Sequence, residues 1–235
     1  MQLPTETDFL VEEFLAASKV EVRGDIDPIS LQADPRRKRA FQAALGRSVA
    51  NATTVIFTHD VEVTLIWFVE ESKRYQTHLV ADLDNVVKPL LDAVTGPDGV
   101  LVDDNQVQSL RVMWMTPGPL GTRFEMTLEP LSPDDYVPRA GISFVEFSLD
   151  RCYMLPGGLG EHESEIHCEI VSAHRRSLAA YHELVSAGMV EDLARTVLPI
   201  KRPFPRARLG SFEVRHEREF PHVDGTSRSS TPAPP

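Results

Sequence analysis

Apolar and polar residues alternate along several stretches of the chain, and each of these stretches predicts a β-strand. The period of two is clearest from Val61 to Val69, and it recurs over residues 109–114 and 123–129. Successive side chains of a strand point to opposite faces of a sheet, so the alternation places the apolar residues on a buried face. In the first stretch Ile66 and Phe68 stand between the core positions, which predicts a second face that is partly covered.

The period changes from two to about 3.6 over residues 84–94, which predicts an amphipathic helix. At 100° per residue the apolar side chains cover one arc, and the opposite arc holds Asn85, Lys88, Pro89 and Asp92. Asp84 or Asn85 is a suitable N-cap, and Gly96 is a suitable stop. Pro89 fits best if Asn85 is the cap, because the N–H that proline lacks then falls in the first turn.

The predicted elements follow one another in the order β-α-β-α-β-β over residues 19–131. The first strand covers residues 20–22, and a helix capped by Asp34 runs to about Leu45. This order favours a mixed β-sheet with helices packed against it, so we expect an α+β fold. Ahead of this domain a short leading helix is predicted within residues 1–18, from the apolar residues Phe9, Leu10, Phe14 and Leu15.

The remainder of the chain predicts a linker at residues 132–138 and a C-terminal extension at residues 139–222 of unknown role. In the extension, strands are expected at residues 142–147 and 166–171 and a helix at about residues 173–186. They form either a small appended module or an enlargement of the first sheet. Residues 223–235 are rich in Ser, Thr and Pro, which is typical of a disordered tail.

Four acids gather around one lysine in the middle of the chain. Asp82 and Asp84 are predicted in an extended segment before the helix, where residues two apart point to the same face and both carboxylates can reach one ion. Lys88 lies one helical turn further on. A strand after the turn at residues 96–99 would bring Asp103 and Asp104 back to the same place.

Carboxylates this close raise each other's pKa unless a cation compensates, and oxygen ligands from short segments suit Mg²⁺. We therefore interpret the cluster as a Mg²⁺ site. Each acid alone has a structural alternative. An Asp at a helix start is usually a cap, and Asp84, Lys88 and Asp92 at steps of four could form exposed ion pairs. The joint pattern favours the metal site over these alternatives.

The sequence around the acids resembles the RusA-like Holliday junction resolvases. It reads DLDNVVKPLLDAV over residues 82–94 and VDDNQV over residues 102–107. The family signature is D-x-D-N-x-x-K-x-x-x-D-A-[LV] followed by D-D-x-Q-[VI], so the match is specific. By the order of its elements the resemblance extends over residues 19–131.

The resemblance implies a homodimeric, Mg²⁺-dependent endodeoxyribonuclease that cuts branched DNA in recombination and repair, with Mn²⁺ as a possible substitute. By position it implies that Asp82, Asp84 and Asp104 are the metal ligands. Lys88 would be the catalytic lysine, Asn85 would act near the DNA backbone, and Asp103 would support the ligands without binding the ion. Neighbouring carboxylates would keep Lys88 protonated, so we expect it to stabilise charge rather than to act as a base.

The charge distribution limits where DNA can bind. The chain has a formal net charge of −11, and residues 1–138 hold 22 acidic and 12 basic residues. DNA affinity comes largely from neutralised phosphates, so a local basic patch is required. The best candidate is the cluster Arg36, Arg37, Lys38 and Arg39 on the polar side of the first helix, with an exposed helix face as the alternative. A second group, for which a solvated linker is favoured, comprises Lys201, Arg202, Arg206, Arg208 and Arg215.

One departure from the family and three absent features, a membrane span, a signal peptide and a disulfide framework, also bear on the prediction. Residues 78–81, His-Leu-Val-Ala, stand where the family commonly has a basic stretch before the first acid. No apolar run reaches the roughly 18 residues of a membrane span, and the acidic start is wrong for a signal peptide, so we expect a cytoplasmic protein. Cys152 and Cys168 are too few for a disulfide framework.

Two further functions therefore remain open beside the junction nuclease. One is a non-catalytic RusA-like module that binds a protein partner. The other is a metal-dependent nuclease that acts on flap or single-stranded DNA.

Overall fold

The computed structural model describes residues 3–76, 81–118, 121–147, 151–199 and 201–221. Two compact units make up the chain. Unit 1 consists of Met1–Gly141 and Ala207–Phe212, and unit 2 consists of Ile142–Arg206 and Glu213–Pro235. The tail predicted to be disordered, residues 223–235, lies outside the described residues.

A mixed β-sheet is the centre of unit 1, as the order of predicted elements indicated. Among the described residues five strands pair in the order β1-β2-β6-β4-β5. Only β4 and β5 pair in parallel, and the other neighbours are antiparallel. The α+β fold is confirmed. The strands are β1 (Phe9–Phe14), β2 (Lys19–Gly24), β4 (Val61–Phe68), β5 (Val107–Met115) and β6 (Phe124–Pro130).

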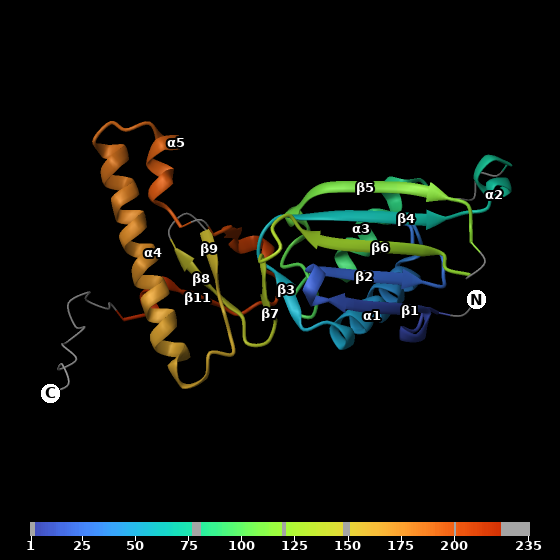
Figure 1. The fold of residues 1–235 in the computed structure, drawn as a ribbon, viewed down its shortest axis with the longest axis horizontal. Helices are drawn as coiled ribbons and strands as arrows, with labels where there is room; N and C mark the ends of the chain where they lie inside the picture. The colour runs from blue at the N-terminus through green and yellow to red at the C-terminus, as the bar shows by residue number, and fades with distance from the viewer. Residues whose placement is uncertain (1–2, 77–80, 119–120, 148–150, 200, 222–235) are drawn as a thin grey trace. The chain divides into compact units, whose positions relative to one another are not determined.

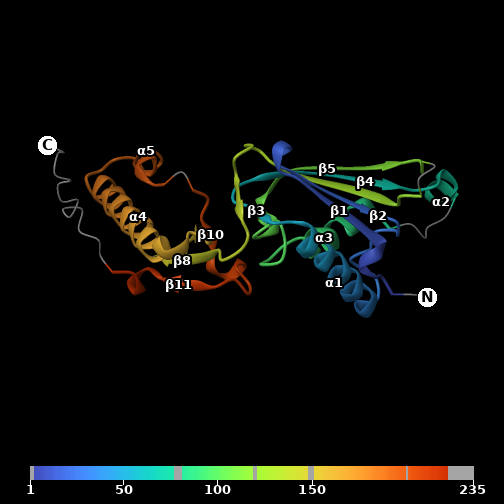
Figure 2. The same ribbon diagram turned by 60° about the horizontal axis from the view of Figure 1, so that its bottom comes forward.

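Two helices cover one face of this sheet, as Figures 1 and 2 show from two directions. They are α1 (Pro35–Ala52) and α3 (Leu83–Ala93), and a short helix α2 (Glu71–Gln76) follows β4. The alternation predicted for β4 and β6 is confirmed, because their apolar positions are buried against the helices. Asp34 caps α1 as predicted and accepts hydrogen bonds from the N–H groups of Arg36 and Arg37 at 3.0 Å. The helix is longer than expected and ends at Ala52.

The predicted leading helix is wrong. Residues 6–17 form β1 between two 3-10 turns, η1 (Glu6–Asp8) and η2 (Leu15–Ala17). Ser18 follows in the left-handed region at φ 50°, and the chain then returns along β2 with Phe9 opposite Gly24. Phe9 and Val11 are buried while Leu10 is exposed, which is the period of a strand.

Helix α3 begins earlier than predicted, and Pro89 lies in its interior. Asp82 is the N-cap residue, and Asp84 is already inside the first turn, not in an extended segment. An interior proline cannot donate to the carbonyl four residues before it, which here belongs to Asn85. The N–H of Leu31 bonds this carbonyl instead at 2.6 Å, so the loop before α1 satisfies it.

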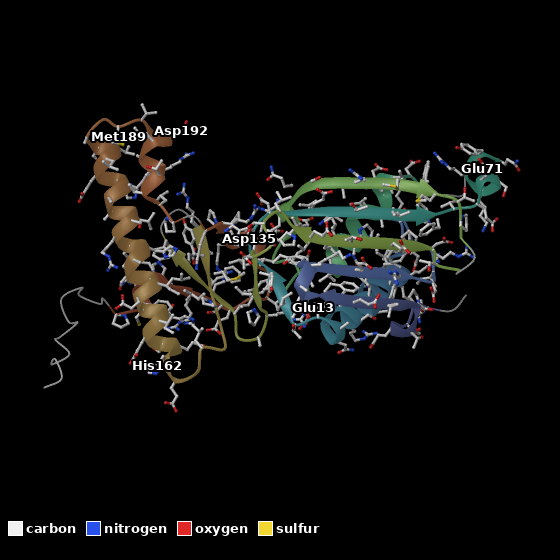
Figure 3. All side chains as sticks on the ribbon, in the orientation of Figure 1. Glu13, Glu71, Asp135, His162, Met189 and Asp192 are labelled. Carbon is white, nitrogen blue, oxygen red and sulfur yellow. The ribbon has the colours of Figure 1, made fainter. Side chains whose placement is uncertain are left out.

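The segment predicted as a linker belongs to unit 1. Residues 136–138 form β7 (Tyr136–Pro138), which pairs with β3 (Val55–Phe57). Glu13, labelled in Figure 3, accepts hydrogen bonds from the backbone N–H groups of Thr54 and Val55 at 2.9 and 3.1 Å. This carboxylate ties the end of β1 to the start of β3.

Unit 2 has its own small sheet and one long helix. Its described strands pair in the order β10-β9-β8-β11, and α4 packs on them through Cys168 and Val171. Figure 3 labels His162 before α4, Met189 after it and Asp192 in α5. The bounds are β8 (Ser143–Phe147), β9 (Arg151–Leu155), β10 (Phe204–Pro205), β11 (Val214–His216), α4 (Glu163–Ser186) and α5 (Glu191–Ala194), with 3-10 turns η5 (Gly160–His162), η6 (Arg195–Val197) and η8 (Glu217–Glu219). The 3-10 turn η7 (Arg206–Arg208) begins at the last residue of this part of unit 2 and continues into the segment Ala207–Phe212 of unit 1.

The strand predicted at residues 166–171 is wrong, because these residues lie in α4. The strand at residues 142–147 and the helix at residues 173–186 are confirmed by β8 and by the second half of α4. Unit 2 therefore carries a helix of 24 residues on a sheet of its own and does not enlarge the sheet of unit 1.

Candidate active site

Helix α3 carries three polar side chains at steps of four residues. Asp84, Lys88 and Asp92 follow one another along one face, about 6 Å apart along the helix axis. All three are exposed, as is Asp82 at the N-cap, while the opposite face buries Val86 and Leu90. The burial of the apolar face therefore fixes the direction in which the polar face points.

The second acidic segment is a tight turn that enters β5. Asp103 is the N-cap residue of the 3-10 turn η3 (Asp104–Gln106), and β5 starts at Val107. The sequence placed both acids at the start of a strand, and the structure places them in the turn just before it. Asp103 is 7% exposed, whereas Asp104 is half-buried, so only Asp104 turns partly toward solvent.

Gln106 holds this turn in place, a role that the sequence analysis did not assign to it. Its side chain is fully buried. Its Oε1 accepts the N–H groups of Val102 and Asp103 at 2.7 and 3.1 Å, and its Nε2 donates to the carbonyls of Phe57 and His59 at 3.0 and 2.8 Å. One amide thus fastens the acidic turn to the connection between β3 and β4. The glutamine of the quoted motif was the signal that could have revealed it.

Lys88 joins the two acidic segments. Its Nζ donates to Asp92 Oδ1 and to Asp104 Oδ2, both at 2.5 Å. Partial burial acts to lower the pKa of Lys88, but the bonds to Asp104 and Asp92 outweigh it and raise the pKa above its ordinary value. The ammonium group therefore stays charged at neutral pH.

Arg208 reaches the same turn from a distant part of the chain. Its Nη1 lies 3.4 and 3.3 Å from the two carboxylate oxygens of Asp103 and 3.4 Å from Asp104 Oδ1. A solvated linker was predicted for Arg208, and the structure instead places it in unit 1 beside the acids. The run of basic residues among prolines was a signal of charge, but not of this contact.

The pKa values of the two neighbouring acids of the turn are shifted in opposite directions. The hydrogen bond from Lys88 lowers the pKa of Asp104 below its ordinary value, although partial burial acts against it. Burial raises the pKa of Asp103, and the nearby Arg208 only partly offsets this effect. Asp104 is therefore the carboxylate that remains ionised most readily at the surface of the turn.

The carboxylates have the oxygen chemistry that a hard divalent ion prefers. In the described part of the chain, however, no three His, Cys, Asp or Glu side chains stand close enough to hold one ion. Lys88 lies one turn after Asp84 along α3, and the protein's own cations bond Asp104. The oxygen donors suit a divalent ion chemically, and Asp104 is paired with Lys88 and Arg208 in this conformation.

The predicted basic cluster opens α1 at its exposed end. Arg36 and Arg39 are exposed, and Lys38 donates to the carbonyl of Leu31 at 3.1 Å. Arg37 lines a hollow of about 420 Å³ together with two further cations and with Ala81, which directly precedes Asp82. The two further cations are Lys73 and Arg123, and Asp27, Ile29, Trp67 and Glu70 also line the hollow.

Comparisons with known proteins bear on the segment that holds the site. Every helix in the described ranges is too short or too polar to span a bilayer. No curated protein matches the chain. The family model described as Endodeoxyribonuclease RusA matches residues 29–126, which include α1, β4, α3, the acidic turn and β5. Residues 29–126 of this chain are therefore similar to the RusA endodeoxyribonuclease family.

Proposed function

We propose that unit 1 is a divalent-metal-dependent endonuclease that hydrolyses phosphodiesters in Holliday junctions or related branched DNA. The observation that carries this proposal is the bond between Lys88 and Asp104, sixteen residues apart in the chain, inside the segment that matches RusA. A lysine held between acids on a surface is the arrangement expected where negative charge develops during phosphodiester hydrolysis.

In this proposal Asp82, Asp84 and Asp104 would hold Mg²⁺, for which Mn²⁺ could substitute. The bound ion would supply an activated water and neutralise charge on the phosphate. Asp103, which is buried behind Asp104, would support the ligand without binding the ion. Asn85 stands in the first turn of α3 between Asp82 and Lys88 and would act near the DNA backbone.

Lys88 would stabilise negative charge and would not accept a proton. Its raised pKa supports this assignment, because a base must spend part of its time neutral at the working pH. Its bonds to Asp92 and Asp104 would fix the ammonium group beside the ligands before substrate arrives. Positioning of this kind lowers the reorganisation needed at the moment of reaction.

The DNA would lie along the start of α1 and the hollow that Arg37 lines. Arg36, Arg37, Lys38 and Arg39 form a local cluster of positive charge on an acidic chain, and Ala81, which lines the hollow, directly precedes Asp82. We further propose that the protein acts as a homodimer in the cytoplasm, in recombination and repair, so that two sites can cut opposed strands of a junction.

A non-catalytic interaction module is the second candidate. The pairing of Asp104 with Lys88 and Arg208 favours it, because this acid is already bonded to the protein's own cations. A third candidate, a nuclease for flap or single-stranded DNA, has the same site residues and differs only in substrate.

The test is cleavage of a labelled four-way junction, compared with flap, single-stranded and linear duplex DNA, with Mg²⁺ and with EDTA. The proteins are the wild type, Asp84→Asn and, as a matched control, Asp98→Asn, which changes an exposed acid after α3. Cleavage that requires Mg²⁺, is lost in Asp84→Asn and persists in Asp98→Asn supports the proposal. Cleavage only of flap or single-stranded DNA supports the third candidate. A folded wild type that cuts none of these DNAs supports the second.

A further inference from the structure

Arg208 lies outside the segment that matches RusA, yet it contacts the acidic turn of the candidate site. We propose that Arg208 is a phosphate-binding residue of the nuclease site, supplied by the segment Ala207–Phe212. This inference rests on the proposed function, since it assigns Arg208 to the DNA that the site would cut. It adds a residue that the family segment does not contain.

The segment that carries Arg208 is anchored in unit 1. Leu209, the next residue, is 1% exposed, and Phe212 is 7% exposed. The N–H of Phe212 bonds the carbonyl of Leu209 at 3.0 Å, and Gly210 between them adopts φ 53°. Two buried apolar side chains and a closed turn therefore fix the position of the Arg208 backbone.

The contacts of Arg208 leave much of its guanidinium group available. All three contacts to Asp103 and Asp104 use Nη1, at 3.3 to 3.4 Å. Its Nε and Nη2 have no partner among the described residues, and half of the side chain is exposed. An arginine that binds a carboxylate through a parallel pair of hydrogen bonds forms a tighter contact than this one. The planar group can thus still offer two donors to a phosphate, the geometry in which arginine binds that anion.

The local charge supplies a reason for a cation at this place. Asp103 and Asp104 are adjacent in the acidic turn, and Lys88 joins Asp104 to Asp92, so DNA that approaches the turn meets several carboxylates. Lys88 already has two carboxylate partners. Arg208 adds a second positive charge at the edge of the acidic turn, which would offset the repulsion between the turn and the phosphates.

A purely structural role for Arg208 predicts a different result. In that role the contacts would only tie the segment to the acidic turn, and exposed ion pairs of this kind contribute little. Removal of Arg208 would then leave DNA affinity and its salt dependence unchanged. A phosphate contact is detected by the slope of affinity against salt, which falls by about 0.9 for each phosphate lost on duplex DNA.

The experiment compares Arg208→Ala and Arg208→Lys with the matched control Arg206→Ala. Arg206 stands in the same 3-10 turn, is exposed and pairs with Glu146 at 3.8 Å. Binding to a four-way junction is measured in EDTA at several salt concentrations, and single-turnover cleavage is measured with Mg²⁺. We expect Arg208→Ala to reduce the salt slope by about 0.9 and the cleavage rate by about tenfold or more. Arg208→Lys recovers part of both, because it keeps the charge but not the planar group.

The outcomes separate this inference from the proposed function. If the wild type cleaves and Arg208→Ala binds and cleaves like Arg206→Ala, the inference on Arg208 is overturned and the proposed function stands. If the wild type binds the junction without cleaving it, the salt slope alone decides the role of Arg208. A wild type that neither binds nor cleaves branched DNA overturns both. If Arg208→Ala fails to fold in a thermal melt, Arg208→Lys and Arg208→Gln take its place in the same comparison.

Discussion

Substitution of Gln106 tests whether one buried amide positions the acidic turn. In Gln106→Ala four backbone groups lose their partners, namely the N–H groups of Val102 and Asp103 and the carbonyls of Phe57 and His59. An unsatisfied buried polar group costs about 1–3 kcal/mol, and water that enters the space left by the side chain recovers part of it. At about 1 kcal/mol for each group the loss of stability is about 4 kcal/mol, which is exceptional for a single substitution.

The matched control is Gln108→Ala, which removes an exposed glutamine from β5 two residues further on. Urea denaturation of both variants gives the free energy of unfolding, provided that the slope against urea concentration stays that of the wild type. We expect Gln108→Ala to lie within about 0.5 kcal/mol of the wild type, the usual range for a surface change. Gln106→Ala that is equally close to the wild type would refute the role of this amide.

A second variant separates the two halves of the Gln106 contact. Gln106→Glu keeps the shape and the oxygen that accepts from Val102 and Asp103, but it loses the hydrogens donated to Phe57 and His59. Two carbonyls then face a carboxylate, so we expect a larger loss of stability at pH 8 than at pH 5, where the carboxyl is more often protonated. Equal stability at both pH values would contradict this reasoning.

Further predictions concern charge and protonation. Lys88→Ala should slow cleavage by about a hundredfold while it changes junction affinity little, and a loss confined to affinity would contradict its assigned role. The double charge reversal of Arg36 and Arg37 to Glu should weaken junction binding and lower the salt slope by about 1.8 if both contact duplex phosphates; an unchanged slope would move the DNA surface elsewhere. Burial lowers the pKa of His174 below its ordinary value of 6.5, with Lys201 adding to the effect and a bond to the Ile170 carbonyl opposing it. Stability from the neutral ring is therefore complete above pH 6.5 and is lost as the pH falls toward the folded pKa. Thermal melts between pH 5 and 8 should show this loss in the wild type and a smaller one in His174→Phe.

The sequence predicted the fold correctly where the spacing of apolar residues fits only one type of secondary structure. The alternation of β4 and β6 and the apolar arc of α3 were correct, because long periodic segments bury one face wherever they lie. At the N-terminus, Phe9, Leu10, Phe14 and Leu15 also fit a helical spacing. The pairing of β1 with β2 and β2 with β6 decides the strand, and these contacts are not visible in the local sequence.

The missed parts of the site depend on contacts between distant residues. Pro89 is tolerated inside α3 because Leu31, far earlier in the chain, bonds the carbonyl that proline leaves unpaired. Arg208 reaches Asp103 from a segment more than a hundred residues later. The motif predicted a site at the acids and Lys88, but no local pattern could show which distant side chain would join them.

The most direct test of the central claim is the cleavage of a four-way junction by the wild type and by Asp104→Asn, each with Mg²⁺ and with EDTA. Asp104 is the acid that Lys88 and Arg208 both contact, so its substitution changes the site while the buried Gln106 still holds the turn. The account predicts paired nicks by the wild type with Mg²⁺ only, and none by Asp104→Asn. Cleavage in EDTA, or equal cleavage by folded Asp104→Asn, would contradict it.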